Sequence, residues 1–164
     1  MAETLPPPLQ KRLPDELASS ALFLLKRLGA AAKERSFNAY TELGLHPYHH
    51  AILAVLDQGS CETQGAIAEA LGYDKGQLVG LLDELEEGGL VKRQRDPADR
   101  RRQIVQMTPA GRKTLDRLRR LSQQLEVEFL AALDEGERRD LYALLQRLGE
   151  HHLPNYRPPS SAKR

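Results

Sequence analysis

Apolar residues recur at helical spacing over the first third of the chain. From Asp15 to about Thr41 they repeat about every 3.6 residues, behind a proline and an acidic residue that suit a first helical turn. A second apolar series begins at Pro47 and stops at Gly59, so the pattern predicts two helices. Their apolar positions are Leu17, Ala21, Leu24, Leu25, Leu28, Ala31 and Ala32 in the first helix, and Tyr48, Ala51, Ile52, Val55 and Leu56 in the second.

Two shorter helices joined by a tight, glycine-containing turn come next. Thr63 can cap a helix over residues 64–71. Asp74, with a glutamine three residues on as in a capping box, opens a helix that runs to about Glu87. Such a pair is typical of a helix-turn-helix, and residues 60–62 before it are compatible with a brief strand. The positions predicted to face inward are Ile67, Ala68, Leu71, Leu78, Leu81, Leu82 and Leu85.

The remaining pattern predicts a β-hairpin and two further helices. Residues 90–93 and 103–107 are compatible with strands and flank a polar tip that contains a proline. Thr108 precedes a proline, as an N-cap does, and apolar residues extend the following helix toward Leu133. Asp134, with a glutamate three residues on, predicts the cap of a last amphipathic helix. The fold class is therefore mainly α-helical with a small β-hairpin.

Composition narrows the class of protein. The chain has 164 residues, 40% of them hydrophobic, which fits one ordinary domain with a core of its own. It contains no apolar run of about 20 residues and no secretory signal pattern, so we expect a cytoplasmic protein without a membrane partner. A single cysteine, Cys61, excludes an internal disulfide and a cysteine-based zinc site; we expect it to be structural.

The net charge of +1 conceals a segregation of charge along the chain. Residues 91–120 contain eleven basic and three acidic side chains, a local charge of +8 that leaves −7 for the rest. A local basic block in a neutral chain is the footprint of a polyanion-binding surface, although a solvated charged face gives the same pattern. Because the block includes the predicted hairpin beside the helix-turn-helix, double-stranded DNA is the expected partner.

Candidate DNA contacts come from the helix-turn-helix and from the hairpin. The second helix of such a motif places its N-terminal residues at base edges in the major groove, and a basic hairpin acts as a wing on a neighbouring groove or the phosphates. Lys75 and Gln77 can bond to bases or phosphates, while Gly76 and Gly80 let the backbone approach closely. We expect Asp99 to tie back one wing arginine. The full set is Thr63, Gln64, Asp74, Lys75, Gly76, Gln77, Val79, Gly80, Arg93, Arg95, Arg100, Arg101 and Arg102.

Three motifs in order make the sequence resemble the MarR family of transcriptional regulators. They are a helix exit at Leu82–Val91, a wing tip at Asp96–Arg101 and a wing exit at Val105–Gly111. The resemblance implies a winged helix-turn-helix protein that acts as a homodimer, most often a ligand-responsive repressor on a pseudo-palindromic operator. It implies the following organisation: an arm at 1–13, dimerisation regions at 14–45 and 109–152, a DNA-binding region at 46–108 and a flexible tail at 153–164.

The chain departs from the family pattern in its second motif helix. Where the family often has Thr-x-Thr-Arg, this sequence has Gln77–Gly80, so the usual arginine is replaced by Gly80. The family's base recognition at that position does not carry over. Glu84, Glu86 and Glu87 are expected to lie toward the end of the helix that faces away from the groove.

Three histidines close together in the sequence are candidates for a metal site or a ligand pocket. His46 and His49 could share a metal ion, but no cysteine lies near and no carboxylate has a fixed ligand spacing, so we expect no metal and no cofactor. The resemblance to the MarR family implies that this region holds a small phenolic or aromatic effector. The candidate pocket residues are Tyr40, His46, Tyr48, His49 and His50, for which a packed dimer contact is an equal alternative.

Catalysis has no support in the sequence. There is no G-x-S-x-G elbow, no P-loop and no dinucleotide-binding glycine motif, so we expect no enzyme. The alternative to a DNA-binding regulator is a helical protein-interaction module, in which the basic block only keeps the surface soluble.

Overall fold

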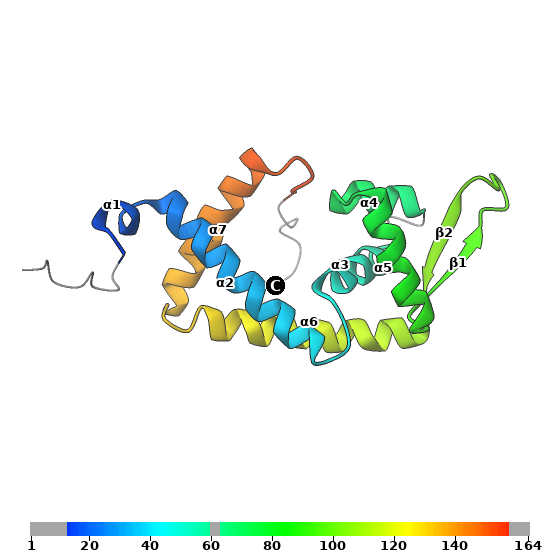
Figure 1. Cartoon of the computed structure of the whole chain (residues 1–164), viewed down its shortest axis with the longest axis horizontal. Coiled ribbons are helices and arrows are strands. Elements are labelled where there is room, and N and C mark those ends of the chain that lie inside the picture. Colours follow the sequence, from blue (N-terminus) through cyan, green and yellow to red (C-terminus); the bar gives the residue numbers. More distant parts are fainter. Residues whose placement is uncertain (1–12, 60–62, 158–164) are drawn as a thin grey trace, which may run out of the picture. The chain divides into compact units, whose positions relative to one another are not determined.

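The computed structural model describes residues 13–59 and 63–157, and the chain divides into two parts, residues 1–35 and 36–164 (Figure 1). Each part is described by itself. The predicted brief strand at 60–62, Cys61, the arm through residue 12 and the tail beyond residue 157 lie outside the described residues. No helix in the described ranges combines the length and the apolar character that a membrane crossing requires.

The first part holds α1 (Asp15–Ala18) and most of α2 (Ala21–Thr41). The prediction of one continuous helix from residue 15 is wrong, because a serine pair interrupts it. Ser19 Oγ donates to the Asp15 carbonyl at 2.8 Å and closes α1, while Ser20 Oγ accepts from a backbone amide in the first turn of α2. Serine hydroxyls compete with helical backbone bonds in this way. The apolar side chains Leu22, Leu24, Leu25 and Leu28 of α2 are exposed.

The second part is built around α3 (Pro47–Asp57), which packs against α4 (Gln64–Leu71), α5 (Lys75–Glu87) and α6 (Pro109–Phe129) (Figure 1). The predicted inward positions of α4 and α5 are confirmed at six buried residues, and only Leu71 is partly exposed. In α3 the buried stripe is His49, Ile52 and Leu53, and the other predicted positions are only partly buried. The fully buried side chains are Ile52, Leu53, Ile67, Leu78, Leu82, Leu85, Val91, Val105, Leu115 and Leu118.

The predicted hairpin is confirmed. Strand β1 (Val91–Arg95) pairs antiparallel with β2 (Gln103–Met107), with Val91 opposite Met107 and Arg95 opposite Gln103. A further bridge joins Thr63, just before α4, to Ile104 of β2. The base of the hairpin is thereby attached to the helix-turn-helix, and its tip projects away from the helices (Figure 1).

A close backbone contact fixes the start of α6 against the base of the hairpin. Thr108 Oγ1 accepts from the Gly111 amide at 3.0 Å and donates to the Gly89 carbonyl at 2.7 Å, while the Thr108 amide donates to the Leu90 carbonyl at 3.0 Å. A Cβ at Gly111 would lie 2.1 Å from the Leu90 carbonyl oxygen. Only glycine fits there, which explains physically the threonine and glycine of the wing-exit motif.

Helix α6 ends at Phe129, short of the predicted end at Leu133, and α7 (Glu135–His152) follows. The predicted cap is confirmed: Asp134 accepts from the Glu137 amide, and the Glu137 carboxylate accepts from the Asp134 amide. Leu144, Leu145 and Leu148 of α7 are 55%, 43% and 45% exposed. The amphipathic face predicted for the last helix is therefore left open in the single chain.

Candidate nucleic-acid interface

Three local devices hold α4 and α5 as a helix-turn-helix. Thr63 Oγ1 accepts from the Ala66 amide at 3.2 Å and caps α4. Gly72 ends that helix in the left-handed conformation, with φ of 65°, which favours glycine. Asp74 Oδ1 accepts from the amides of Gly76 and Gln77 at 2.8 and 3.2 Å and caps α5. Two of the candidate DNA contacts, Thr63 and Asp74, therefore already use a side-chain oxygen to shape the motif.

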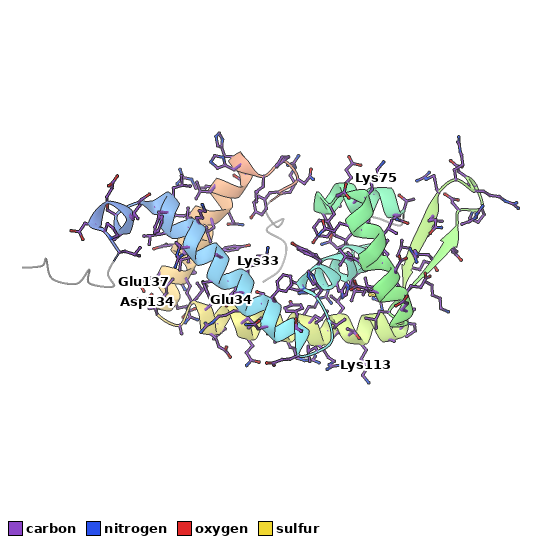
Figure 2. All side chains as sticks on the ribbon, viewed as in Figure 1. Lys33, Glu34, Lys75, Lys113, Asp134 and Glu137 are labelled. Atoms are coloured by element: carbon purple, nitrogen blue, oxygen red, sulfur yellow. The ribbon has the colours of Figure 1, made fainter. Side chains whose placement is uncertain are left out.

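The N-terminal half of α5 presents one face to solvent. Leu78, Leu81 and Leu82 are buried on the other side. Lys75 projects from the first turn of the helix (Figure 2). The exposed residues are Lys75, Gly76, Gln77, Val79 and Gly80, all of them among the sequence candidates.

The wing carries exposed cations around an ordered tip. The expectation that Asp99 ties back one arginine is confirmed, because Arg101 Nε lies 3.1 Å from Asp99 Oδ1. The hydrogen bonds from Arg101 lower the pKa of the Asp99 carboxyl. Arg95, Arg100 and Arg102 are exposed and have no ion-pair partner among the described residues. The wing therefore carries three exposed guanidinium groups outside the ion pair of Arg101.

Arg93 faces the protein instead of the solvent. Strand alternation puts it on the same face as buried Val91, and its guanidinium binds Asp83 and Glu86 of α5, with Nη2 2.7 Å from Glu86 Oε2. Its backbone amide also donates to Glu86 Oε1 at 2.8 Å. These bonds lower the pKa of Glu86 and raise that of Arg93. Arg93 thus connects the wing to α5, with its donors occupied by carboxylates.

Two basic residues of α6 form ion pairs with the end of α3. Arg112 Nη1 and Arg119 Nη2 each lie 2.7 Å from a different oxygen of Asp57, at the end of α3. The hydrogen bond from Arg119 is the main reason that the pKa of Asp57 lies below its usual value, and the charges of both arginines lower it further. Lys113 projects on the side opposite Lys75 (Figure 2). Part of the basic block is therefore engaged in ion pairs within the fold, outside the wing.

Known proteins share this arrangement. A family model described as the MarR family matches residues 43–102. A putative transcriptional regulatory protein for the hcr operon of Thauera aromatica is 34% identical over 134 residues, which cover 80% of each chain. The chain belongs to the MarR family. It is a transcriptional regulator with the winged helix-turn-helix fold of that family.

Solved structures of family members resemble the fold of this chain over most of their length. The transcriptional repressor CouR, bound to a 23-mer DNA duplex, is 31% identical with a TM-score of 0.75, over 84% of this chain and 99% of CouR. CouR from Rhodococcus jostii RHA1 bound to p-coumaroyl-CoA is 25% identical with a TM-score of 0.68, over 86% and 97%. The likeness to MarR-family structures therefore extends over most of the chain and beyond the winged region.

The five residues predicted for a MarR-type effector pocket fall into two groups. Buried Tyr40 places its hydroxyl 2.7 Å from His50 Nδ1 and also bonds to Ser122 of α6. Burial raises the pKa of Tyr40 and lowers that of His50, which the positive charge of Arg119 lowers further. The remaining three residues, His46, Tyr48 and His49, gather at the start of α3.

Histidines cap α3 in a reciprocal arrangement. His46 Nδ1 accepts from the Tyr48 amide at 3.2 Å, and the His46 amide donates to His49 Nδ1 at 3.2 Å. The neutral His49 ring therefore carries its proton on Nε2, which lies 3.0 Å from Glu84 Oε2 although not in hydrogen-bond geometry. No group of three or more metal-ligating side chains occurs within the described ranges. His46 and His49 therefore both take part in the cap of α3.

Sequence reasoning missed three acidic residues that position this MarR-type site. Asp83 and Glu86 share one face of α5, three residues apart, and the alternation of β1 turns Arg93 toward the protein, so their contact was open to prediction. Asp57 gave no local signal, since its arginine partners lie 55 and 62 residues away in the sequence.

Proposed function

We propose that this MarR-family regulator is a homodimeric repressor that binds a pseudo-palindromic DNA operator through α5 and the wing. The observation that carries the proposal is the exposed N-terminal half of α5 together with wing cations that have no ion-pair partner among the described residues. The DNA-bound structure of CouR, with the same fold at 31% identity, supports it. We also propose that the chain acts in the cytoplasm and is not an enzyme.

The cations divide between two tasks. Lys75 and Gln77, in the first turn of α5, lie where a recognition helix meets base edges and phosphates. Arg95, Arg100 and Arg102 suit the phosphates or a narrow minor groove beside it. Arg93 and Arg101, tied to carboxylates, hold the wing in place and are not proposed as contacts.

Exposed leucines support dimerisation through residues 14–45 and 109–152. In the second part these are Leu144, Leu145 and Leu148 of α7, next to a pocket of about 180 Å³ between α6 and α7 lined by Leu130, Leu141 and others. In the first part, Leu22 is 79% exposed on α2. Apolar area of this kind is buried in a stable assembly. A dimer also sets the two α5 helices about 34–36 Å apart, one turn of DNA.

A small phenolic or aromatic effector is proposed to act near Tyr40, His46, Tyr48, His49 and His50. The p-coumaroyl-CoA complex of CouR supports this class of compound. A phenol that competes for the bond between Tyr40 and His50 would disturb the contact of α3 with α2 and α6. Effector binding then favours a different spacing of the two α5 helices in the dimer and releases the DNA. Titration calorimetry with p-coumarate and p-coumaroyl-CoA tests it, and heat of binding that a Tyr40→Phe variant retains in full would contradict it.

The test of DNA binding compares two charge variants by fluorescence anisotropy. The probe is a duplex from the DNA upstream of the chain's own gene, measured at several salt concentrations. A chain with Arg100→Ala and Arg102→Ala loses four phosphate contacts per dimer, so its log–log salt slope falls by about 4. Lys113→Ala, on the far face, is the matched control and leaves the slope unchanged. Equal slopes for both variants would instead favour a protein-interaction module.

A further inference from the structure

The side chain of Val79 is apolar and exposed on α5, the proposed recognition helix. It is 39% exposed, and it is the only large hydrophobic side chain exposed among the described residues between 44 and 126. Most other exposed large apolar side chains lie in the regions proposed to dimerise, chiefly on α2 and α7. Val79 is outside those regions, so dimerisation does not explain its exposure.

Glycines flank Val79 on the same helix face, and the fold does not require one of them. Gly76 lies three residues before Val79 and four before Gly80, so it is adjacent to both on the surface of α5. A Cβ at Gly80 would meet no atom within 4 Å, whereas one at Gly76 would lie 3.1 Å from the capping oxygen of Asp74. Glycine inside a helix is less favourable than alanine. Within the chain, nothing offsets that cost at Gly80.

A smooth helix face with one apolar projection suits the floor of a major groove. Thymine is the base that presents a methyl group there, and apolar side chains contact that methyl. Missing side chains on either side let the helix backbone come closer to the bases. The family pattern often has an arginine where this chain has Gly80, and arginine is the side chain that most often bonds to guanine. A side-chain hydrogen bond to guanine is therefore not available at that position.

We propose that Val79 contacts a thymine methyl group in each operator half-site, and that Gly80 admits the close approach this contact needs. The proposal rests on the proposed DNA-binding function and specifies which base chemistry it recognises. Lys75 and Gln77 then anchor the start of the helix, while Val79 selects for thymine.

The first step of the test selects tight-binding duplexes from random DNA with the full-length chain. Failure to enrich any sequence would refute the proposed function itself. From an enriched operator, each thymine is then replaced in turn by uracil, which removes only the methyl group. One symmetric uracil pair should weaken wild-type affinity about fourfold per half-site, the factor that matches burial of one methyl group.

Two variants separate a methyl contact from an indirect effect. The Val79→Ala chain should bind the uracil and thymine operators equally, while the control Lys113→Ala should keep the wild-type discrimination. The inference is overturned if wild-type and Val79→Ala chains lose the same factor at every uracil position.

Gly80→Ala tests the close approach without a risk of misfolding. Because its Cβ meets nothing within the chain, the melting temperature should rise by about 2–4 °C. Operator affinity should nevertheless fall about tenfold, with affinity for non-specific DNA unchanged. A Gly80→Ala chain that binds the selected operator as tightly as the wild type overturns the inference.

Discussion

Substituting Gly111 by alanine tests how closely α6 is joined to the wing. Gly111 lies in the first turn of α6, where its amide donates to Thr108 Oγ1. The new Cβ would lie 2.1 Å from the Leu90 carbonyl oxygen and 2.8 Å from Met107 Cγ. The side chain of Met107 can move, but the carbonyl of Leu90 cannot, since it accepts the Thr108 amide at 3.0 Å.

The size of the effect follows from that distance. A carbon and a carbonyl oxygen approach to about 3.3 Å at closest, so the start of α6 must shift by about 1 Å. Overpacking of this kind costs typically 1–3 kcal/mol, and the shift also weakens the bonds of Thr108 to Gly89 and Leu90, worth about 1 kcal/mol each. After the gain in helix propensity from alanine, the free energy of unfolding should fall by about 3 kcal/mol.

Urea denaturation at a fixed protein concentration measures this loss. With a slope of about 2 kcal/mol per molar urea, the midpoint should fall by about 1.5 M at unchanged slope. Gly80→Ala is the matched control, because its Cβ has no contact within 4 Å and its midpoint should rise. A Gly111→Ala midpoint equal to the wild type would refute the close contact described between α6 and the wing.

Three further predictions concern the ion pairs and histidines. Arg93→Ala should weaken operator affinity on the order of tenfold by freeing the wing from α5, yet leave the salt slope unchanged because Arg93 positions rather than contacts phosphate; a reduced slope would contradict this. Asp57 has a lowered pKa, so its contribution to stability is present above about pH 4 and lost below it. The difference in urea midpoint between wild type and Asp57→Asn should therefore shrink between pH 6 and pH 3, and a constant difference would count against the ion pairs. Burial chiefly lowers the pKa of His49, so the unfolded chain takes up a proton first and stability should fall as pH drops below about 6.5. His49→Gln should flatten that dependence in a thermal melt from pH 8 to pH 5, and an unaltered profile would exclude His49 as its source.

Much of the fold was predictable because its signals are local. Helix caps at Thr63, Asp74, Thr108 and Asp134 each depend on a side chain and amides within three residues, and all four are confirmed. The break at Ser19 was missed because the apolar spacing continues through it, and the competing serine bonds leave no trace in hydrophobic periodicity.

The candidate site was predictable in composition but not in the roles of its charges. The basic block at residues 91–120 can be found by counting charged residues. Which of its arginines face outward depends on strand alternation and on carboxylates that are distant in the sequence. The contact of Asp57 with α6 depends on how two helices pack, which no local pattern encodes. The histidines, in contrast, suggested a ligand site by their number, while two of them cap a helix.

Hydroxyl-radical footprinting of the dimer on its selected operator tests the central claim most directly. We expect two protected half-sites about one helical turn, or 10–10.5 base pairs, apart, related by two-fold symmetry. Protection in the flanking grooves should disappear with Arg100→Ala and Arg102→Ala and persist with Lys113→Ala. A single unpaired footprint, or flanking protection that survives loss of both wing arginines, would contradict a dimer that reads DNA through α5 and the wing.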